Sequence, residues 1–400
     1  MIRLQTFWEE LRTNYWFVPA VMSVMAIALS FGLVGLDRTL RDEMVRELGW
    51  VYSGGPEGAR GVLSTIAGSV IGVAGTTFSI TIAVLSLATG QFGPRLLRGF
   101  MRDRGNQIVL GTFTSTFLYC LLVLRTVRGT DENTYVPHLS VTFAVLLAIA
   151  NMGVLIYFVN HVAESIQVSR IIEKVGNEVD ASVDRLFPKE IGAAPGSTTL
   201  PEGASKTIRA RESGYVVAVD EVRLLRTAMK ENLMVKLVAR PGDHIVFDMP
   251  LVSVWPESAE SDDAIRGAFT LSHTRTSFQD VEFALMELAE IGVRALSPGT
   301  NDPFTAIACL DRLTVSMCRL AERQRPSAFR HDKNGDLRVV AEPYSYGRLV
   351  AAAFGHIRHA AKGEPAVLER LRISLDLVRS RAKDASLDKA LELERNSAES

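Results

Sequence analysis

The sequence predicts a membrane protein in two parts: an α-helical membrane domain of four transmembrane helices, then a cytoplasmic α+β region with a small barrel-sandwich-like β module and a helical domain. Segment 62–89 holds about 28 consecutive residues without a charged side chain, a run that a lipid bilayer accommodates. Segments 16–36, 108–124 and 139–162 have the same character. The 400 residues are 47% hydrophobic and 22% charged, which is too polar for a chain embedded entirely in lipid.

The first two apolar segments lead to different expectations. The first is predicted to be a retained helix, because it is too long for a signal peptide, begins with the interfacial anchors Trp16 and Phe17, and lacks a small-x-small cleavage site. The second would extend about 40 Å as a helix, against a hydrocarbon core of about 30 Å. It is therefore expected to tilt or to project beyond one membrane face.

Positive charges in the short connections predict the orientation. Between the second and third helices lie Arg95, Arg98, Arg102 and Arg104. The positive-inside rule places this loop, and with it both termini, in the cytoplasm. The loop 37–61, which then lies outside, also carries four arginines and argues against this orientation. The four arginines of the inner loop either set topology and contact anionic lipid headgroups, or form a basic ring at a cytoplasmic mouth that gathers anions.

Composition divides the chain into a membrane domain (1–163), a helical stalk and linker (164–205), a small β module (206–256) and a helical domain (257–400). The β module alternates apolar and polar residues and is similar to the barrel-sandwich modules of biotinyl and lipoyl carriers. Where a carrier presents a modifiable lysine, this chain has the segment 246–250, Val-Phe-Asp-Met-Pro. A structural or docking role is therefore preferred over a carrier role.

Small and hydroxylated residues follow one face of the second membrane helix at steps of three or four: Gly61, Thr65, Gly68, Gly72, Gly75, Ser79, Ala83, Ser86 and Gly90. We call this set the small-residue stripe. It is interpreted either as a surface for close helix packing or as a pore-lining face with hydroxyl oxygens for an ion. The candidates for either role are Thr65, Gly68, Gly72, Thr76, Ser79, Ser86 and Asn151.

The polar residues within the predicted membrane helices limit the possible mechanisms of transport. Asn151 in the fourth segment is expected to bond a neighbouring helix, with a permeation role as the alternative. No acidic or basic residue lies well inside any span, so a proton relay has no candidate there.

The loop 297–303, Ser-Pro-Gly-Thr-Asn-Asp-Pro, joins two predicted helices. Asn301, Asp302 and Pro303 have a structural explanation as a helix cap and first turn, but so polar a loop between apolar helices is also a candidate contact for a ligand or subunit. The candidate contact residues around it are Arg275, Gln279, Asp280, Ser297, Asn301 and Asp302. They flank opposite ends of one helix and are not expected to form a single site within one subunit.

Other classes of function lack a signature. A formal net charge of -1 without a basic stripe argues against nucleic acid as a partner, and none is predicted. The three cysteines have no zinc-binding spacing, and His356 with His359 lacks a third ligand, so no metal and no cofactor is predicted. No nucleophile elbow, phosphate loop or acid–base constellation points to an enzyme.

Several motifs together carry a resemblance. These are FSIT at 78–81 with QFGPRLL at 91–97, RT at 275–276 with QD at 279–280, and ALSPGTNDPFTA at 295–306. The chain resembles, over nearly its whole length, the bacterial membrane proteins grouped as domain of unknown function 2254. The resemblance implies a multi-pass protein of the bacterial inner membrane with a cytoplasmic carboxy-terminal region, and it supplies no catalytic residues.

These observations lead to one functional hypothesis and one alternative. The hypothesis is an oligomeric ion channel or transporter-like protein, with the second helix near a central axis and a cytoplasmic region that gates or senses. Its expected partners are the lipid bilayer, other copies of the chain and small ions. The alternative is a membrane-anchored sensor or scaffold whose cytoplasmic domain binds a ligand or a protein without transport.

Overall fold

The structure is a computed structural model that describes residues 16–39, 51–92, 103–130, 133–165, 167–189 and 198–398. The chain divides into two compact units, residues 1–167 and 168–400. Each unit is described by itself.

The first unit holds four helices that are long and apolar enough to cross a membrane, as predicted: α2 (Phe17–Thr39), α4 (Pro56–Phe92), α6 (Arg104–Leu124) and α7 (His138–Ser165). All four extend several residues beyond one or both ends of the predicted apolar segments, because charged and polar residues continue the helices past their apolar parts. The helix α4 has 37 residues and a length of about 54 Å. It is longer than the hydrocarbon core of a bilayer.

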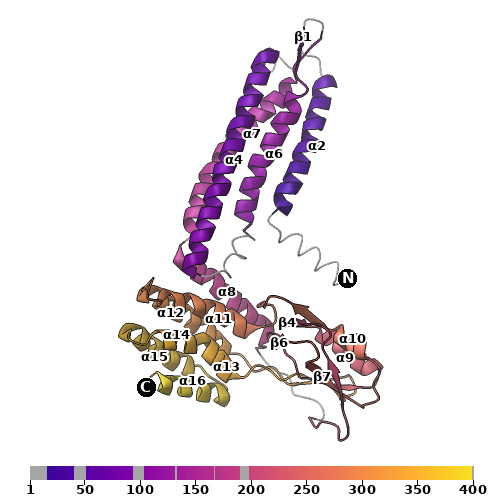
Figure 1. The fold of residues 1–400 in the computed structure, drawn as a ribbon, viewed down its shortest axis with the longest axis vertical. Helices are drawn as coiled ribbons and strands as arrows, with labels where there is room; N and C mark the ends of the chain where they lie inside the picture. The colour runs from indigo at the N-terminus through magenta and orange to yellow at the C-terminus, as the bar shows by residue number, and fades with distance from the viewer. Residues whose placement is uncertain are drawn as a thin grey trace. The chain divides into compact units, whose positions relative to one another are not determined.

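Helix α6 is the centre of this unit and lies between α2 and α4, with α7 packed against it as well (Figure 1). Leu63, Tyr119 and Val123 belong to one buried cluster, and Phe113 and Phe158 to another. The first cluster draws residues from all four helices, and the second draws residues from α4, α6 and α7.

A polar cap closes the end of the bundle where α2 ends and α7 begins. The carboxylate of Asp37 accepts hydrogen bonds from the amides of Leu139 and Ser140 at 2.9 and 3.0 Å and from the hydroxyl of Ser140 at 2.6 Å. These amides open α7 and have no partner within the helix. The hydroxyl of Tyr119 donates to the carbonyl of Ser140. A short hairpin, β1 (Arg128–Thr130) and β2 (Asn133–Tyr135), joins α6 to α7.

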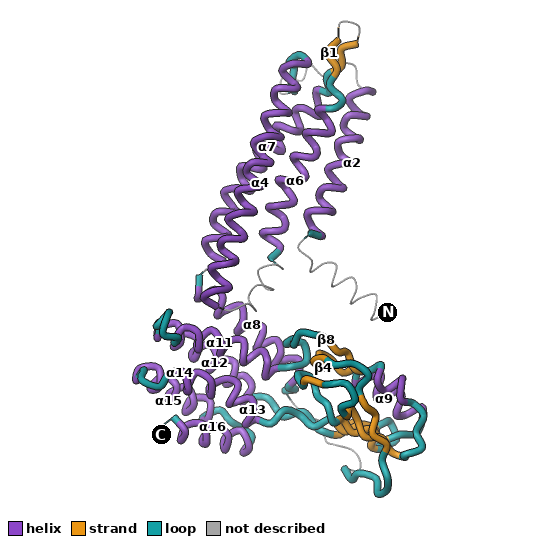
Figure 2. The backbone as a smooth tube through the Cα atoms, in the orientation of Figure 1, coloured by secondary structure: helices purple, strands orange, loops and turns teal. Residues whose placement is uncertain are grey.

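Apart from α9 (Glu221–Lys230) and α10 (Asp262–Arg266), the helices of the second unit lie to one side of its strands (Figure 2). They are α8 (Val168–Leu186), α11 (Val281–Ala295), α12 (Pro303–Ala321), α13 (Tyr346–Val350), α14 (His356–Ala360), α15 (Pro365–Arg379) and α16 (Ala385–Ser397); a π-helical turn, Ala351–Gly355, joins α13 to α14. The segment predicted as a stalk is α8, and it packs on α11 and α12. Arg312 of α12 pairs with Asp180 of α8 at 2.8 Å, so this segment is part of the folded unit.

The strands form two sheets. One has the order β3 (Lys206–Arg209), β7 (Pro250–Trp255), β5 (Met234–Leu237), β10 (Leu337–Val340), β9 (Phe329–His331); the other has the order β6 (His244–Ile245), β4 (Gly214–Val219), β8 (Phe269–Ser272). Helices α9 and α10 complete this region. Its core includes Val216, Leu224, Val252 and Ile265.

The strands extend beyond the predicted β module of 206–256. Strand β10 pairs in parallel with β5, with Val339 opposite Val235, and brings the hairpin partner β9 with it. Strand β8 pairs antiparallel with β4. The β region thus draws strands from the part of the chain that was predicted to be helical, because pairing between segments so far apart in sequence leaves no local signal.

Candidate functional site

The small-residue stripe of α4 is exposed along its whole length within the first unit. At about 100° per residue its members fall within about 40° of one direction, and the buried residues of α4, such as Leu63, Val70 and Ala74, lie about 180° away. The large side chains of Ile71 and Phe78 flank the stripe on one side and are also exposed. The stripe therefore points away from α2, α6 and α7.

The glycines of the stripe leave open space above the helix. A methyl group built on Gly68, Gly72 or Gly75 has no atom of another described element within 4 Å. Such a surface lets a second helix approach the backbone closely.

The hydroxyl groups on this side of α4 bond within the helix. Thr76 donates to the carbonyl of Gly72 at 3.1 Å, and Ser79 donates to that of Gly75 at 2.9 Å. Because each hydroxyl proton is used in this way, its oxygen keeps lone pairs for an outside donor or a cation. Thr65 and Ser86 are exposed on the same side.

Asn151 does not belong to this surface. It is 4% exposed between α7 and α6, where its Nδ2 donates to the hydroxyl of Thr116 at 2.8 Å and to the carbonyl of Leu147 at 2.7 Å. Its Oδ1 is buried without a hydrogen-bond partner among the described residues. The contact between helices that was expected for Asn151 is present.

Three of the arginines assigned to the inner loop, Arg95, Arg98 and Arg102, lie outside the described residues. The fourth, Arg104, is exposed in the first turn of α6. Asp103 caps that turn: its Oδ1 accepts from the amide of Gly105 at 2.8 Å and lies 3.0 Å from Nε2 of His161 on α7.

In the second unit, three candidate residues meet at the start of α11. Arg275 donates from Nε to Oδ2 of Asp280 at 2.6 Å, and Oδ1 of Asp280 caps α11 through the amide of Phe283. The side chain of Gln279 accepts from the amide of Val219 at 2.8 Å and donates to its carbonyl at 3.2 Å. The side chain of Gln279 thus pairs with the backbone of Val219 at the end of β4, as the backbone of a neighbouring strand would.

Further residues complete this arrangement, and they were not among the candidates predicted from the sequence. The hydroxyl of Tyr344 contacts the carbonyl oxygens of Pro241 and Gln279 at 2.7 and 3.0 Å, and Glu282 pairs with Arg348 at 2.8 Å. We call Arg275, Gln279, Asp280, Glu282, Tyr344 and Arg348 the α11 start cluster. It ties the turn at 240–243 and strand β4 to helices α11 and α13.

Burial sets the electrostatics of this cluster. Burial raises the pKa of Tyr344, and the nearby carboxylates of Asp280 and Glu282 raise it further. Burial alone would lower the pKa of Arg275, but its hydrogen bond to Asp280 and the charges of Asp280 and Glu282 raise it instead. Arg275 therefore carries a positive charge, and Tyr344 is a neutral phenol. These are the protonation states expected of residues in a structural contact.

The loop 297–303 is internally bonded. Asn301 adopts a left-handed backbone with φ of +46°, and its amide donates to the carbonyl of Ser297 at 2.9 Å. Asp302 caps α12: its Oδ1 accepts from the amide of Thr305 at 3.1 Å and its Oδ2 from the hydroxyl of Thr305 at 2.6 Å. These bonds lower the pKa of Asp302, the hydroxyl bond most.

The candidate contact residues of the second unit form two separate groups. Asp280 caps the start of α11, and Asp302 caps the start of α12, which follows the other end of α11; α11 spans about 21 Å over its 15 residues. No group of three His, Cys, Asp or Glu side chains in the described parts of the chain could hold a metal ion.

Comparison with known proteins extends these observations. The family described as "Predicted membrane protein (DUF2254)" matches residues 12–376. Uncharacterized proteins of Mycobacterium bovis and Mycobacterium tuberculosis are 33% identical over 349 residues, which cover 84% of this chain and 66% of each relative. The chain thus spans just under two thirds of the length of these relatives. No solved structure matches. With four candidate membrane helices and a match over most of its length, the chain belongs to the DUF2254 family of membrane proteins.

Proposed function

We propose that the protein assembles as a homo-oligomer in the bacterial inner membrane, with α4 of each subunit facing a common axis, and that it conducts small cations along this axis. The observation that carries the proposal is the exposed small-residue stripe, which lies opposite the face that α4 buries in its own bundle. In this proposal both termini are cytoplasmic and the second unit gates or senses.

Two features of α4 support an assembly of several copies. Its glycines leave room for close contact with another helix, and large apolar side chains flank them. Helices in lipid associate through small residues because these let the backbones approach, whereas a surface of large apolar side chains is equally well solvated by lipid. The stripe is therefore better explained by a partner helix than by lipid.

The hydroxyl geometry supports cations over anions. Ser79 and Thr76 donate their protons to their own helix, so the oxygens that face outward act as acceptors. Rings of such oxygens can replace part of the hydration shell of a cation. The described part of the stripe carries no basic side chain that would attract an anion.

The second unit enters the proposal as a gating or sensing region. The likeness of its β strands to barrel-sandwich modules stays a prediction, as do the docking role drawn from it and the headgroup or mouth role of the inner-loop arginines.

The experiment measures ion flux from proteoliposomes that contain the purified full chain, with potassium, sodium and chloride gradients and empty vesicles as the blank. We expect flux of potassium or sodium and little flux of chloride. Leucine at Ser79 fills the space beside the helix and removes an oxygen, so Ser79→Leu is expected to abolish the flux.

Two glycine variants distinguish the loss of a pore along α4 from general damage to the fold. Gly72 lies in the stripe and Gly153 on α7, and a methyl group on either has no atom of another described element within 4 Å. Gly72→Leu should reduce both flux and cross-linked oligomers, whereas Gly153→Leu should leave both unchanged. Absence of flux for every ion, from protein shown to be folded and inserted, would overturn conduction and favour the membrane-anchored sensor or scaffold. Chloride-selective flux would overturn the choice of cations.

A further inference from the structure

The first turn of α12 carries the most exposed large apolar side chain in the described part of the chain, Phe304, which is 81% exposed. It directly follows the loop 297–303, whose residues 298–301 are exposed as well. A phenyl ring gains free energy when it leaves water for apolar surroundings. Because single exposed apolar residues are common on protein surfaces, the place of Phe304 in the fold has to show what covers it.

Ion pairs fix the direction in which α12 runs beside α8. Asp180 of α8 pairs with Arg312 at 2.8 Å, and four residues later Asp184 pairs with Arg319 at 2.5 Å. Residue numbers rise in the same direction along both helices, so the two helices are parallel. Phe304 precedes Arg312 by eight residues, or about 12 Å along the helix, and it therefore lies beside the first turns of α8.

The start of α8 lies close to the end of a membrane helix. Helix α7, a candidate membrane span, ends at Ser165, and α8 begins at Val168. Within this connection the amide of Gln167 donates to the carbonyl of Glu164 at 3.1 Å. Three residue steps reach at most about 11 Å, and the axes of packed helices are about 8–10 Å apart. For any angle between α7 and α8, Phe304 is therefore held within a distance on the order of 20 Å of the end of α7.

The loop 297–303 leaves few backbone N–H groups free. Amides that donate to carbonyl oxygens of the loop or of the last turn of α11 are those of Ser297, Thr300, Asn301 and Asp302. Pro298 and Pro303 have no N–H group. The side chain of Asp302 accepts from the amide of Thr305 in the first turn of α12. An unpaired backbone N–H is costly where lipid displaces water, so a loop bonded in this way suits a lipid surface.

We propose that the loop 297–303 and the first turn of α12 contact the membrane surface from which α7 emerges, with the ring of Phe304 inserted among the lipid headgroups. The side chains of a helix tilt toward its N-terminus, so this ring is directed past the start of α12. One aromatic ring binds lipid weakly, but the covalent connection to α7 keeps it at a high effective concentration beside the bilayer. The contact does not depend on ion conduction.

The experiment measures the surroundings of position 304 with a nitroxide spin label, in the full chain reconstituted into nanodiscs of phosphatidylcholine and phosphatidylglycerol. The label is apolar and is attached in the Phe304→Cys variant. The native cysteines Cys120, Cys309 and Cys318 are buried and should not react. Oxygen concentrates in lipid and a nickel chelate concentrates in water, so the ratio of the two collision rates, measured by power-saturation EPR, distinguishes lipid from water.

Val315 supplies the matched control. It is 57% exposed and lies on the same face of the same helix, about 16 Å beyond Phe304. We expect the ratio of oxygen to nickel collisions to be several-fold higher at position 304 than in the labelled Val315→Cys variant. Equal ratios at the two positions, or a lower ratio at 304, would overturn the proposal. A label at 304 that neither reagent reaches, as in a contact with a second copy of the chain, would overturn the choice of lipid.

Discussion

Arg275 and Asp280 form the most enclosed ion pair of the α11 start cluster: the nitrogen and oxygen are 2.6 Å apart, and the side chain of Asp280 is 1% exposed. The pair lies where the turn at 240–243 meets the first turn of α11, because a methyl group built on Gly242 would meet both side chains. It therefore connects the strands to the helices of the second unit.

Removing one member of this pair should destabilise the second unit strongly. Arg275→Ala leaves the carboxylate of Asp280 buried without its cation, a change that costs about 3–5 kcal/mol. The free energy of unfolding is measured by denaturant titration of the full chain. Arg294→Ala is the control, because Arg294 pairs with Glu290 on a partly exposed helix surface, and it should cost about 0.5 kcal/mol or less. Equal costs for the two variants would contradict the connecting role of Asp280.

Gly242 should tolerate no side chain, for two separate reasons. Its φ is +94°, and a methyl group there would clash with the carboxylate of Asp280. Gly363 has a similar φ of +98°, but a methyl group there meets no described atom within 4 Å. Gly363→Ala therefore reports the backbone cost alone, about 1–2 kcal/mol, and Gly242→Ala should cost more. Thermal unfolding of both variants measures the difference, and a smaller loss for Gly242→Ala would contradict the close contact.

Local patterns predicted the four membrane helices, because a run without charges is a property of neighbouring residues. The helix ends were harder to predict, because α4 includes the charged residues Glu57 and Arg60, which lie outside the apolar run but inside the helix. The stripe was predicted to share one face of its helix. Its direction relative to the bundle depends on which other residues of α4 pack against α6 and α7.

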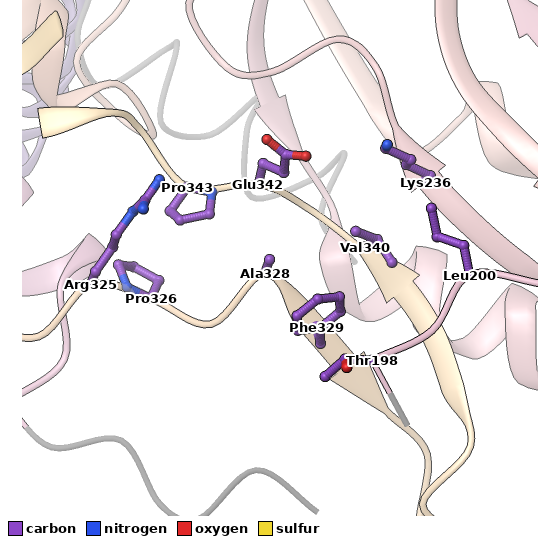
Figure 3. A pocket seen from close by; sticks show the side chains of 10 residues that line it. All are labelled: Thr198, Leu200, Lys236, Arg325, Pro326, Ala328, Phe329, Val340, Glu342 and Pro343. Carbon is purple, nitrogen blue, oxygen red and sulfur yellow. The ribbon is translucent and has the colours of Figure 1, made fainter. Parts of the chain in front are cut away.

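The strand pairing and the α11 start cluster of the second unit depend on contacts between distant parts of the chain. Gln279 pairs with Val219, and β10 with β5, across long stretches that contain other elements. Lys236 and Arg325 line one pocket for the same reason (Figure 3). A single sequence carries no signal for such distant pairs. The cap formed by Asp302 was predicted because its hydrogen-bond partner is close to it in sequence.

The cap at Asp302 should contribute to stability only while it is ionised. Asp302→Ala removes the acceptor for the amide of Thr305 and should cost about 1 kcal/mol at pH 7. Because the folded state lowers the pKa of Asp302, this contribution is present above the unfolded-state pKa of about 3.9 and is lost as the pH falls through the lower folded-state value. Denaturant titrations of both proteins at pH 7 and at successively lower pH should show the difference shrinking below about pH 4. A difference that grows on acidification would contradict this assignment.

The pair of Asn151 and Thr116 should couple α7 to α6 with a modest energy. Asn151→Leu removes the hydrogen bond to Thr116, but it also removes a buried oxygen without a described partner, so its net cost should be small. The coupling is isolated by a double-mutant cycle with Thr116→Val, and about 0.6 kcal/mol is expected for such a bond between membrane helices.

Thr112 supplies the control for this cycle. Its hydroxyl donates to the carbonyl of Ile108 on its own helix at 2.8 Å, so Thr112→Val should show no coupling to Asn151→Leu. Unfolding in mixed detergent micelles measures all six proteins, the wild type included. Equal coupling for Thr112 and Thr116 would mean that Asn151 acts through the general packing of α6. Coupling confined to Thr116 would mean that the buried amide sets the register of α7 on α6, and with it the angle at which the bundle presents α4.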